Sequence, residues 1–116
     1  LAFSVLSSQI ASLDLKSYNI DLKDSRVSGI SGGAYMAGQF HFAHSEHIQG
    51  AAIFAGGPYL CAFGTVQAAT TACMLAPWVI SNTWLETGIG YLERHGYIDP
   101  TSNLKDDPVY LYSGEH

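Results

Sequence analysis

The five residues from Gly29 to Gly33 read G-x-S-x-G, with Ser31 at the centre. Between a strand and a helix, this pattern places a serine hydroxyl on a strained turn at the carboxyl end of the strand, where it can attack a carbonyl carbon. The flanking Gly29 and Gly33 let the strand and the helix approach closely enough to hold that turn. The pattern therefore predicts Ser31 as the nucleophile of an acyl-transfer reaction.

The helix expected after Ser31 adds the second element of this chemistry. Its first N–H groups have no partner inside the helix, so they can stabilise a developing oxyanion, and the backbone N–H of Gly32 is the expected donor. A glycine-rich phosphate-binding turn is the rival interpretation, but the position of the serine and the missing lysine argue against it. The match arises by chance in about one chain in ten of this length, so its context must support it.

A serine nucleophile needs a histidine base held by a carboxylate. In chains of this pattern the order is serine, then the acid after a later strand, then histidine. Only Glu115 and His116 stand at that place here. Glu115 is a candidate acid, whereas His116 is its direct neighbour and is poorly placed to be oriented by it.

The remaining histidines do not form a predicted site. His41, His44 and His47 are spaced three apart, yet no carboxylate or cysteine completes a metal site with them. His95 stands at the end of a predicted helix, where a contact with the helix dipole accounts for it. We expect no metal and no cofactor.

Hydrophobic periodicity indicates the elements that would position Ser31. A parallel sheet with crossover helices is expected because strands and helices alternate. The predicted order is a strand at Arg26–Ser28, a helix at Ala34–His44, a strand at Gly50–Ala55, a loop at Tyr59–Thr71, a helix at Asn82–His95 ended by Gly96, and a strand at Asp107–Tyr112.

Composition limits the partners. Charged residues make up only 13% of the 116-residue chain, its formal net charge is −5, and no basic cluster occurs, which argues against nucleic acid as a partner. No apolar run is long enough to span a membrane.

Residues 1–12 are interpreted as the remnant of a secretory signal, with an ordinary first strand or helix as the alternative. Residues 13–116 then form the domain.

Cys61 and Cys73 lie twelve residues apart in a stretch rich in small residues. Taken by themselves, they are either two buried free thiols or a disulfide, and their spacing matches no zinc motif.

The stretch from Val27 to Cys61, VSGISGGAYMAGQFHFAHSEHIQGAAIFAGGPYLC, resembles the secreted polyhydroxybutyrate depolymerases of the α/β-hydrolase type. In that family a strand leads to a serine elbow, a helix, the motif Ala-Gly-Gly-Pro-Tyr and a cysteine. The stretch from Ile98 to Gly114 is similar to the family's lead-in to the catalytic aspartate. Together the matching motifs cover most of the chain after Leu13.

The resemblance implies that Ser31 is the nucleophile, that Gly32 is an oxyanion donor, and that Cys61 and Cys73 pair. It places the aspartate just past His116, with the histidine and a second oxyanion donor further on. The chain then holds part of an α/β-hydrolase fold, which in one branch of the family is circularly permuted. Gly32 departs from the family, since many relatives have a second serine there.

The function implied is a secreted or periplasmic esterase that cleaves polyhydroxybutyrate or related short-chain esters. One alternative is a general carboxylesterase, feruloyl-type esterase or lipase on the same fold. The other, from a different class, is a non-catalytic fragment without the triad acid and base. Of the aromatic residues Tyr59, Trp78 and Trp84, which are candidates for contacting an apolar polymer, we expect at least two to pack in the core.

Overall fold

The computed structural model describes residues 16–114. The interpretation of residues 1–12 as a signal remnant, and the candidates Glu115 and His116, lie outside this range. In chain order the helices and strands are β1 (Ser25–Ile30), α1 (Gly32–Ala43), β2 (Ile48–Phe54), α2 (Val66–Ala68), α3 (Asn82–Arg94) and β3 (Val109–Tyr112). Shorter 3₁₀ turns occur at Leu22–Asp24, Pro77–Val79 and Thr101–Leu104, and a π-helical turn at Ala69–Cys73.

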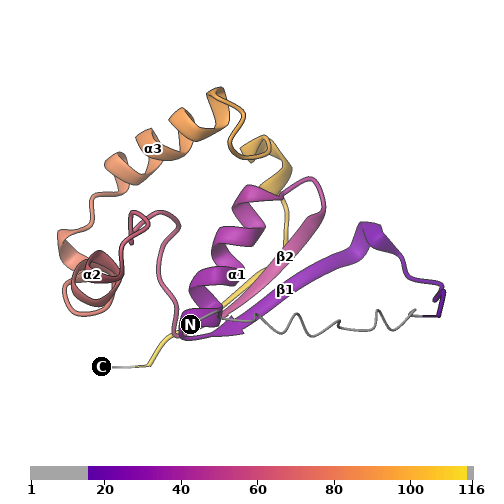
Figure 1. Ribbon diagram of the computed structural model, residues 1–116, viewed down its shortest axis with the longest axis horizontal. Coiled ribbons are helices and arrows are strands. Elements are labelled where there is room, and N and C mark those ends of the chain that lie inside the picture. Colours follow the sequence, from indigo (N-terminus) through magenta and orange to yellow (C-terminus); the bar gives the residue numbers. More distant parts are fainter. Residues whose placement is uncertain (1–15, 115–116) are drawn as a thin grey trace, which may run out of the picture.

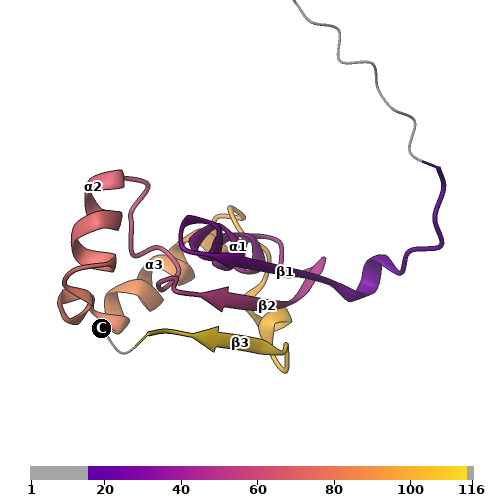
Figure 2. The same cartoon turned by 90° about the horizontal axis from the view of Figure 1, so that it is seen from below.

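The three strands form one parallel sheet in the order β1-β2-β3, which confirms the predicted architecture. Ile30, Phe54 and Tyr112 are aligned across the sheet, so all three strands end at the same level. Figure 2 shows the three arrows side by side and pointing in the same direction.

Helix α1 packs against β1 and β2 on one face of this sheet (Figures 1 and 2). Ala34 and Ala37 are buried on the helix, and such small side chains allow the helix axis to lie close to the strands. The opposite face carries Ile30, which is 73% exposed, together with Tyr110 and Tyr112. Within residues 16–114, the sheet is therefore covered on one face only.

The first strand and helix are longer than predicted and meet at one residue. β1 extends to Ile30 and α1 begins at Gly32, so Ser31 alone separates them. The prediction began the helix at Ala34, where the apolar spacing starts, and glycine is also a poor helix former in a helix interior. At the first two positions this penalty matters less, because the N–H groups there have no helical partner in any case.

The stretch predicted as a loop from Tyr59 to Thr71 contains α2 and the start of the π-helical turn, so that prediction was wrong in part. Thr65 starts the helical segment: its hydroxyl accepts a hydrogen bond from the N–H of Ala68 at 3.2 Å, which satisfies a donor of the first turn. A threonine cap of this kind is a local signal that apolar periodicity does not register.

Helix α3 confirms the predicted helix at Asn82–His95. Ser81 caps it by accepting a hydrogen bond from the N–H of Trp84, and Gly96 follows its end with a φ of 70°, a conformation that glycine adopts at little cost. No helix among residues 16–114 is both long and apolar enough to cross a membrane.

Candidate functional site

Ser31 lies in the tight turn between β1 and α1, with φ 53° and ψ −121°. Residues other than glycine rarely adopt a positive φ, and those that do are held there by their surroundings. The Ser31 N–H donates to the Phe54 carbonyl at 2.9 Å, and the Ser31 carbonyl accepts from the N–H groups of Ala34 and Tyr35 at 2.9 and 3.1 Å. The turn is thus tied to β2 on one side and to α1 on the other.

The side chain of Ser31 is available for other contacts. Ser31 is exposed and stands at the N-cap position of α1, but its hydroxyl makes no capping hydrogen bond to the helix. The first turn of α1 contains no acidic residue, so nothing in that turn offsets the partial positive charge of the helix N-terminus. A hydroxyl and a set of unpaired helix N–H groups therefore meet at the same point.

Gly29 makes the close approach of strand and helix possible. A Cβ built at Gly29 would collide with the carbonyl of Gly33 and lie 2.7 Å from the nitrogen of Ala34. At Gly32 and Gly33 an added Cβ meets no atom within 4 Å. The steric demand of the turn therefore falls on Gly29, and the backbone of Gly33 is what occupies the space beside it.

The carboxyl end of β3 reaches the edge of the sheet at which Ser31 lies. Tyr112 is level with Ile30, the residue before Ser31, and the N–H of Ala55 donates to the Tyr112 carbonyl at 2.8 Å. Neighbouring strands are spaced about 4.8 Å apart, and β2 lies between the two, so the chain leaves β3 about 10 Å from Ser31 along the sheet edge. A side chain following β3 is within reach of a group placed between them.

A pocket of about 440 Å³ opens beside Ser31. One wall comes from α1 and the other from the segment that follows β2. Its lining residues are Ser31, Gly32, Tyr35, Gln39, Leu60, Cys61, Ala62, Phe63, Gly64, Ala69 and Met74. Within residues 16–114, no histidine lines this pocket.

The disulfide between Cys61 and Cys73 confirms the pairing that the resemblance implied. Its Cα atoms are 5.8 Å apart, and both cysteines are buried. Residues 60–64, which include Cys61, form part of the pocket wall. The disulfide therefore holds this wall to the helical turn that ends at Cys73.

Tyr35 separates the pocket from the turn after β2. A Cβ at Gly57 would lie 2.6 Å from a ring carbon of Tyr35 and 2.7 Å from its hydroxyl oxygen, so the ring rests directly on the backbone of Gly57. Burial raises the pKa of the Tyr35 phenol above its ordinary value.

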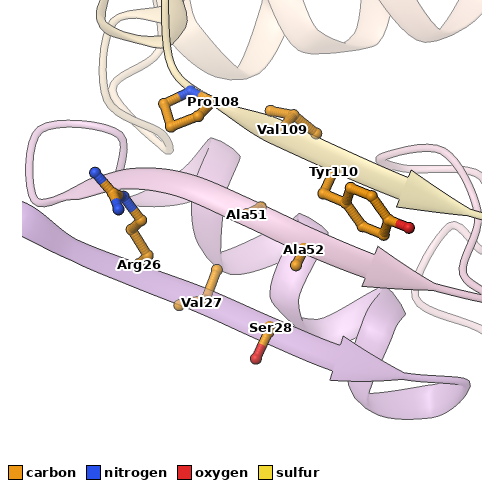
Figure 3. Close-up of a pocket in the computed structure, with 8 residues that line it drawn as sticks. All are labelled: Arg26, Val27, Ser28, Ala51, Ala52, Pro108, Val109 and Tyr110. Atoms are coloured by element: carbon orange, nitrogen blue, oxygen red, sulfur yellow. The ribbon is translucent and has the colours of Figure 1, made fainter.

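A second hollow of about 440 Å³ lies along the strands, away from the turn (Figure 3). Arg26 and Ser28 are among the residues that line this hollow. The Arg26 guanidinium is paired with the Asp24 carboxylate at 2.7 Å. Ser28 lies within β1, away from the helix N-terminus. The hollow beside Ser31 is the better candidate for chemistry, because Ser31 has a positive φ and stands at the N-terminus of α1.

Sequence reasoning missed the contact between His41 and Asp107. The His41 Nε2 lies 2.8 Å from the Asp107 Oδ2, and the two side chains are 5% and 12% exposed. His41 stands ten residues after Ser31, which corresponds to about 15 Å along a helix, so it is not the base for that serine. The available signal was its spacing from Ala34 and Ala37, which places all three on the buried face of α1.

The other histidines and the aromatic candidates lie away from the pocket of Ser31 or on the surface of the described chain. His44 is exposed, and the Nδ1 of His95 lies 2.8 Å from the Tyr91 carbonyl at the end of α3, as expected. Within residues 16–114, no three metal-ligating side chains are grouped to hold an ion. Trp78 is 80% and Trp84 46% exposed, so the prediction that at least two of the three aromatic residues pack in the core was wrong.

Comparison with known proteins confirms the resemblance seen in the motifs. The chain is 38% identical over 115 residues to the poly(3-hydroxybutyrate) depolymerase of Delftia acidovorans, an alignment that covers 98% of this chain and 23% of that protein. It is 42% identical over 116 residues to the polyhydroxybutyrate depolymerase of Talaromyces funiculosus, covering 93% and 31%. The chain thus spans about a quarter to a third of these relatives. No family model and no solved structure matches it significantly.

Proposed function

From the similarity to polyhydroxybutyrate depolymerases, we propose that this chain supplies the nucleophilic part of a serine ester hydrolase acting on polyhydroxybutyrate or related short-chain hydroxyalkanoate esters. The observation that carries the proposal is the backbone of Ser31, held at φ 53° between β1 and α1 with its hydroxyl free of helix capping. That is the geometry a nucleophile elbow requires, and it costs conformational energy that ordinary connections avoid.

In the proposed reaction the Ser31 Oγ attacks the ester carbonyl carbon and forms a tetrahedral intermediate. The backbone N–H of Gly32, at the N-terminus of α1, donates a hydrogen bond to the oxyanion. The intermediate collapses with loss of the alcohol end, which takes up the proton that the base removed from Ser31. Water, activated by the same base, then attacks the acyl-enzyme and releases the acid.

We propose that the base and its aspartate come from sequence beyond His116. Two observations support this. Of the described residues lining the pocket of Ser31, none is a histidine. In addition, β3 ends level with Ile30, the residue before Ser31. The segment that follows β3 therefore starts at the same edge of the sheet as Ser31. The remaining strands of the proposed α/β-hydrolase fold, in permuted order, would also come from elsewhere in such a protein.

The proposed setting is extracellular or periplasmic. A disulfide such as Cys61–Cys73 persists in oxidising compartments and is rare in the cytosol. The proposed mechanism uses no cofactor and no metal, because the serine, its base and the oxyanion donors suffice.

The test is covalent labelling with a fluorophosphonate, followed by intact mass. We expect the 116-residue chain to be labelled once, slowly, because oxyanion stabilisation remains without the base. The label is expected to be lost in Ser31→Ala and kept in the control Ser28→Ala, which alters an exposed serine three residues away. Labelling that survives Ser31→Ala contradicts Ser31 as nucleophile. Rapid stoichiometric labelling contradicts a base outside the chain.

A further inference from the structure

We propose that the pocket beside Ser31 binds the acyl part of the ester, and that Gln39 makes it selective for short hydroxyacyl groups over simple fatty acyl groups. This inference rests on the proposed function, because it takes the acyl group to be the one attached to Ser31. It names Gln39 as a specificity-determining residue.

Gln39 is placed at the far end of the pocket by the helix itself. Ser31, Tyr35 and Gln39 follow one another at four-residue intervals and line the same pocket. The eight helical steps between Ser31 and Gln39 correspond to about 12 Å along the axis. Because helical side chains lean toward the helix N-terminus, we expect the Gln39 amide to lie on the Ser31 side of its own Cα.

Gln39 contributes a side-chain amide that can hydrogen-bond to an oxygen of the acyl chain. The ring of Tyr35 lies beside Gly57 and forms part of the wall. Gln39 is half-buried, and its amide carries both donors and an acceptor. It can therefore bind the hydroxyl of a 3-hydroxyacyl group or the next ester carbonyl of a short polyester.

The opposite wall is apolar, being formed by Leu60, Ala62, Phe63, Ala69 and Met74. Phe63 packs against the ring of Trp84 with centroids 3.9 Å apart. The disulfide links this wall, at Cys61, to Cys73. Leu60 and Phe63 both have positive φ values, 64° and 48°, so this wall keeps a specific, strained backbone shape.

Size and lining together define the ligand class. A volume of about 440 Å³ is at the lower end of small-molecule sites. It suits one or two units bearing short alkyl branches, which would contact the apolar wall while an oxygen meets Gln39. A long fatty acyl chain offers no oxygen for the amide and would cover that half-buried group without giving it a partner.

The experiment is an amide NMR titration of the Ser31→Ala chain, in which binding is measured without chemistry. The probes are ethyl 3-hydroxybutyrate, ethyl butyrate and ethyl octanoate. We expect saturable shifts at Gln39, Gly64 and Ala69, with the hydroxy ester binding about fivefold more tightly than the butyrate, the effect of one neutral hydrogen bond. Gln39→Leu should remove that preference, whereas the control Gln49→Leu, on β2 and outside the pocket, should keep it.

The outcomes separate this inference from the proposed function. Equal binding of the hydroxy and simple esters, tighter binding of the octanoate, or a preference that survives Gln39→Leu would overturn the role of Gln39. Fluorophosphonate labelling that survives Ser31→Ala, with this selectivity intact, would instead overturn Ser31 as nucleophile. Phe63→Ala provides a second variant: opening the apolar wall should improve octanoate binding, and unchanged octanoate binding counts against the pocket as the acyl site.

Discussion

His41 and Asp107, which are 66 residues apart in the chain, meet at 2.8 Å between α1 and the start of β3. Two neighbouring contacts join the same parts of the chain: the Asp99 N–H donates to the Ala43 carbonyl, and the Ser45 hydroxyl donates to the Pro100 carbonyl. The helix that begins at the candidate nucleophile is thereby attached, at its other end, to the segment that leads into β3.

Removing either partner of this buried pair should destabilise the protein. His41→Ala or Asp107→Ala leaves a polar group buried without its partner, and we expect a loss of about 2 to 4 kcal/mol in the free energy of unfolding. Urea denaturation followed by circular dichroism measures it. The matched control is His44→Ala on the exposed side of α1, expected to change stability by less than about 0.5 kcal/mol. Equal effects at positions 41 and 44 would show that the contact contributes nothing.

Two glycines of the G-x-S-x-G pattern should respond in opposite ways to alanine. Gly29→Ala forces a Cβ into the backbone of Gly33, so we expect a loss of at least about 2 kcal/mol in stability. Gly33→Ala meets no atom within 4 Å and replaces a flexible residue in a helix, so it should be neutral or slightly stabilising. Thermal unfolding of both variants decides this. A tolerated Gly29→Ala would mean that strand and helix lie further apart than described.

Loss of the disulfide should loosen the pocket wall as well as the fold. The Cys61→Ala/Cys73→Ala double variant releases a twelve-residue connection, for which the chain-entropy model gives about 3 kcal/mol. Denaturation of the oxidised and reduced chain measures the same quantity without mutation. We expect binding of ethyl 3-hydroxybutyrate to weaken along with stability, and binding that is indifferent to reduction would separate the disulfide from the pocket.

Local features were predictable from the sequence, and contacts between distant segments were not. The turn at Ser31 and the helix ended by Gly96 follow from residues that are neighbours in the chain. The partner of His41 was not visible, because no periodicity links it to a carboxylate 66 residues away. The helical turn after Thr65 was missed because its cap is polar and its residues are small.

β3 illustrates a different limit of the sequence. The run Val109-Tyr110-Leu111-Tyr112 is part of the predicted third strand, and strands of parallel sheets are usually covered on both faces. These four side chains are between 51% and 72% exposed in the described chain. The pattern identified the strand, but no pattern within these residues can state what covers it.

The spacing of the three strands along the chain also affects the order in which the sheet forms. Residues 31–47 connect β1 to β2, whereas residues 55–108 connect β2 to β3. Closing the longer connection costs about 1 kcal/mol more in chain entropy. The β1–α1–β2 unit should therefore form first and β3 should join last, so hydrogen exchange in the native state should be fastest at β3. By bridging twelve residues of the longer connection, the disulfide shortens the path over which β3 must find its place.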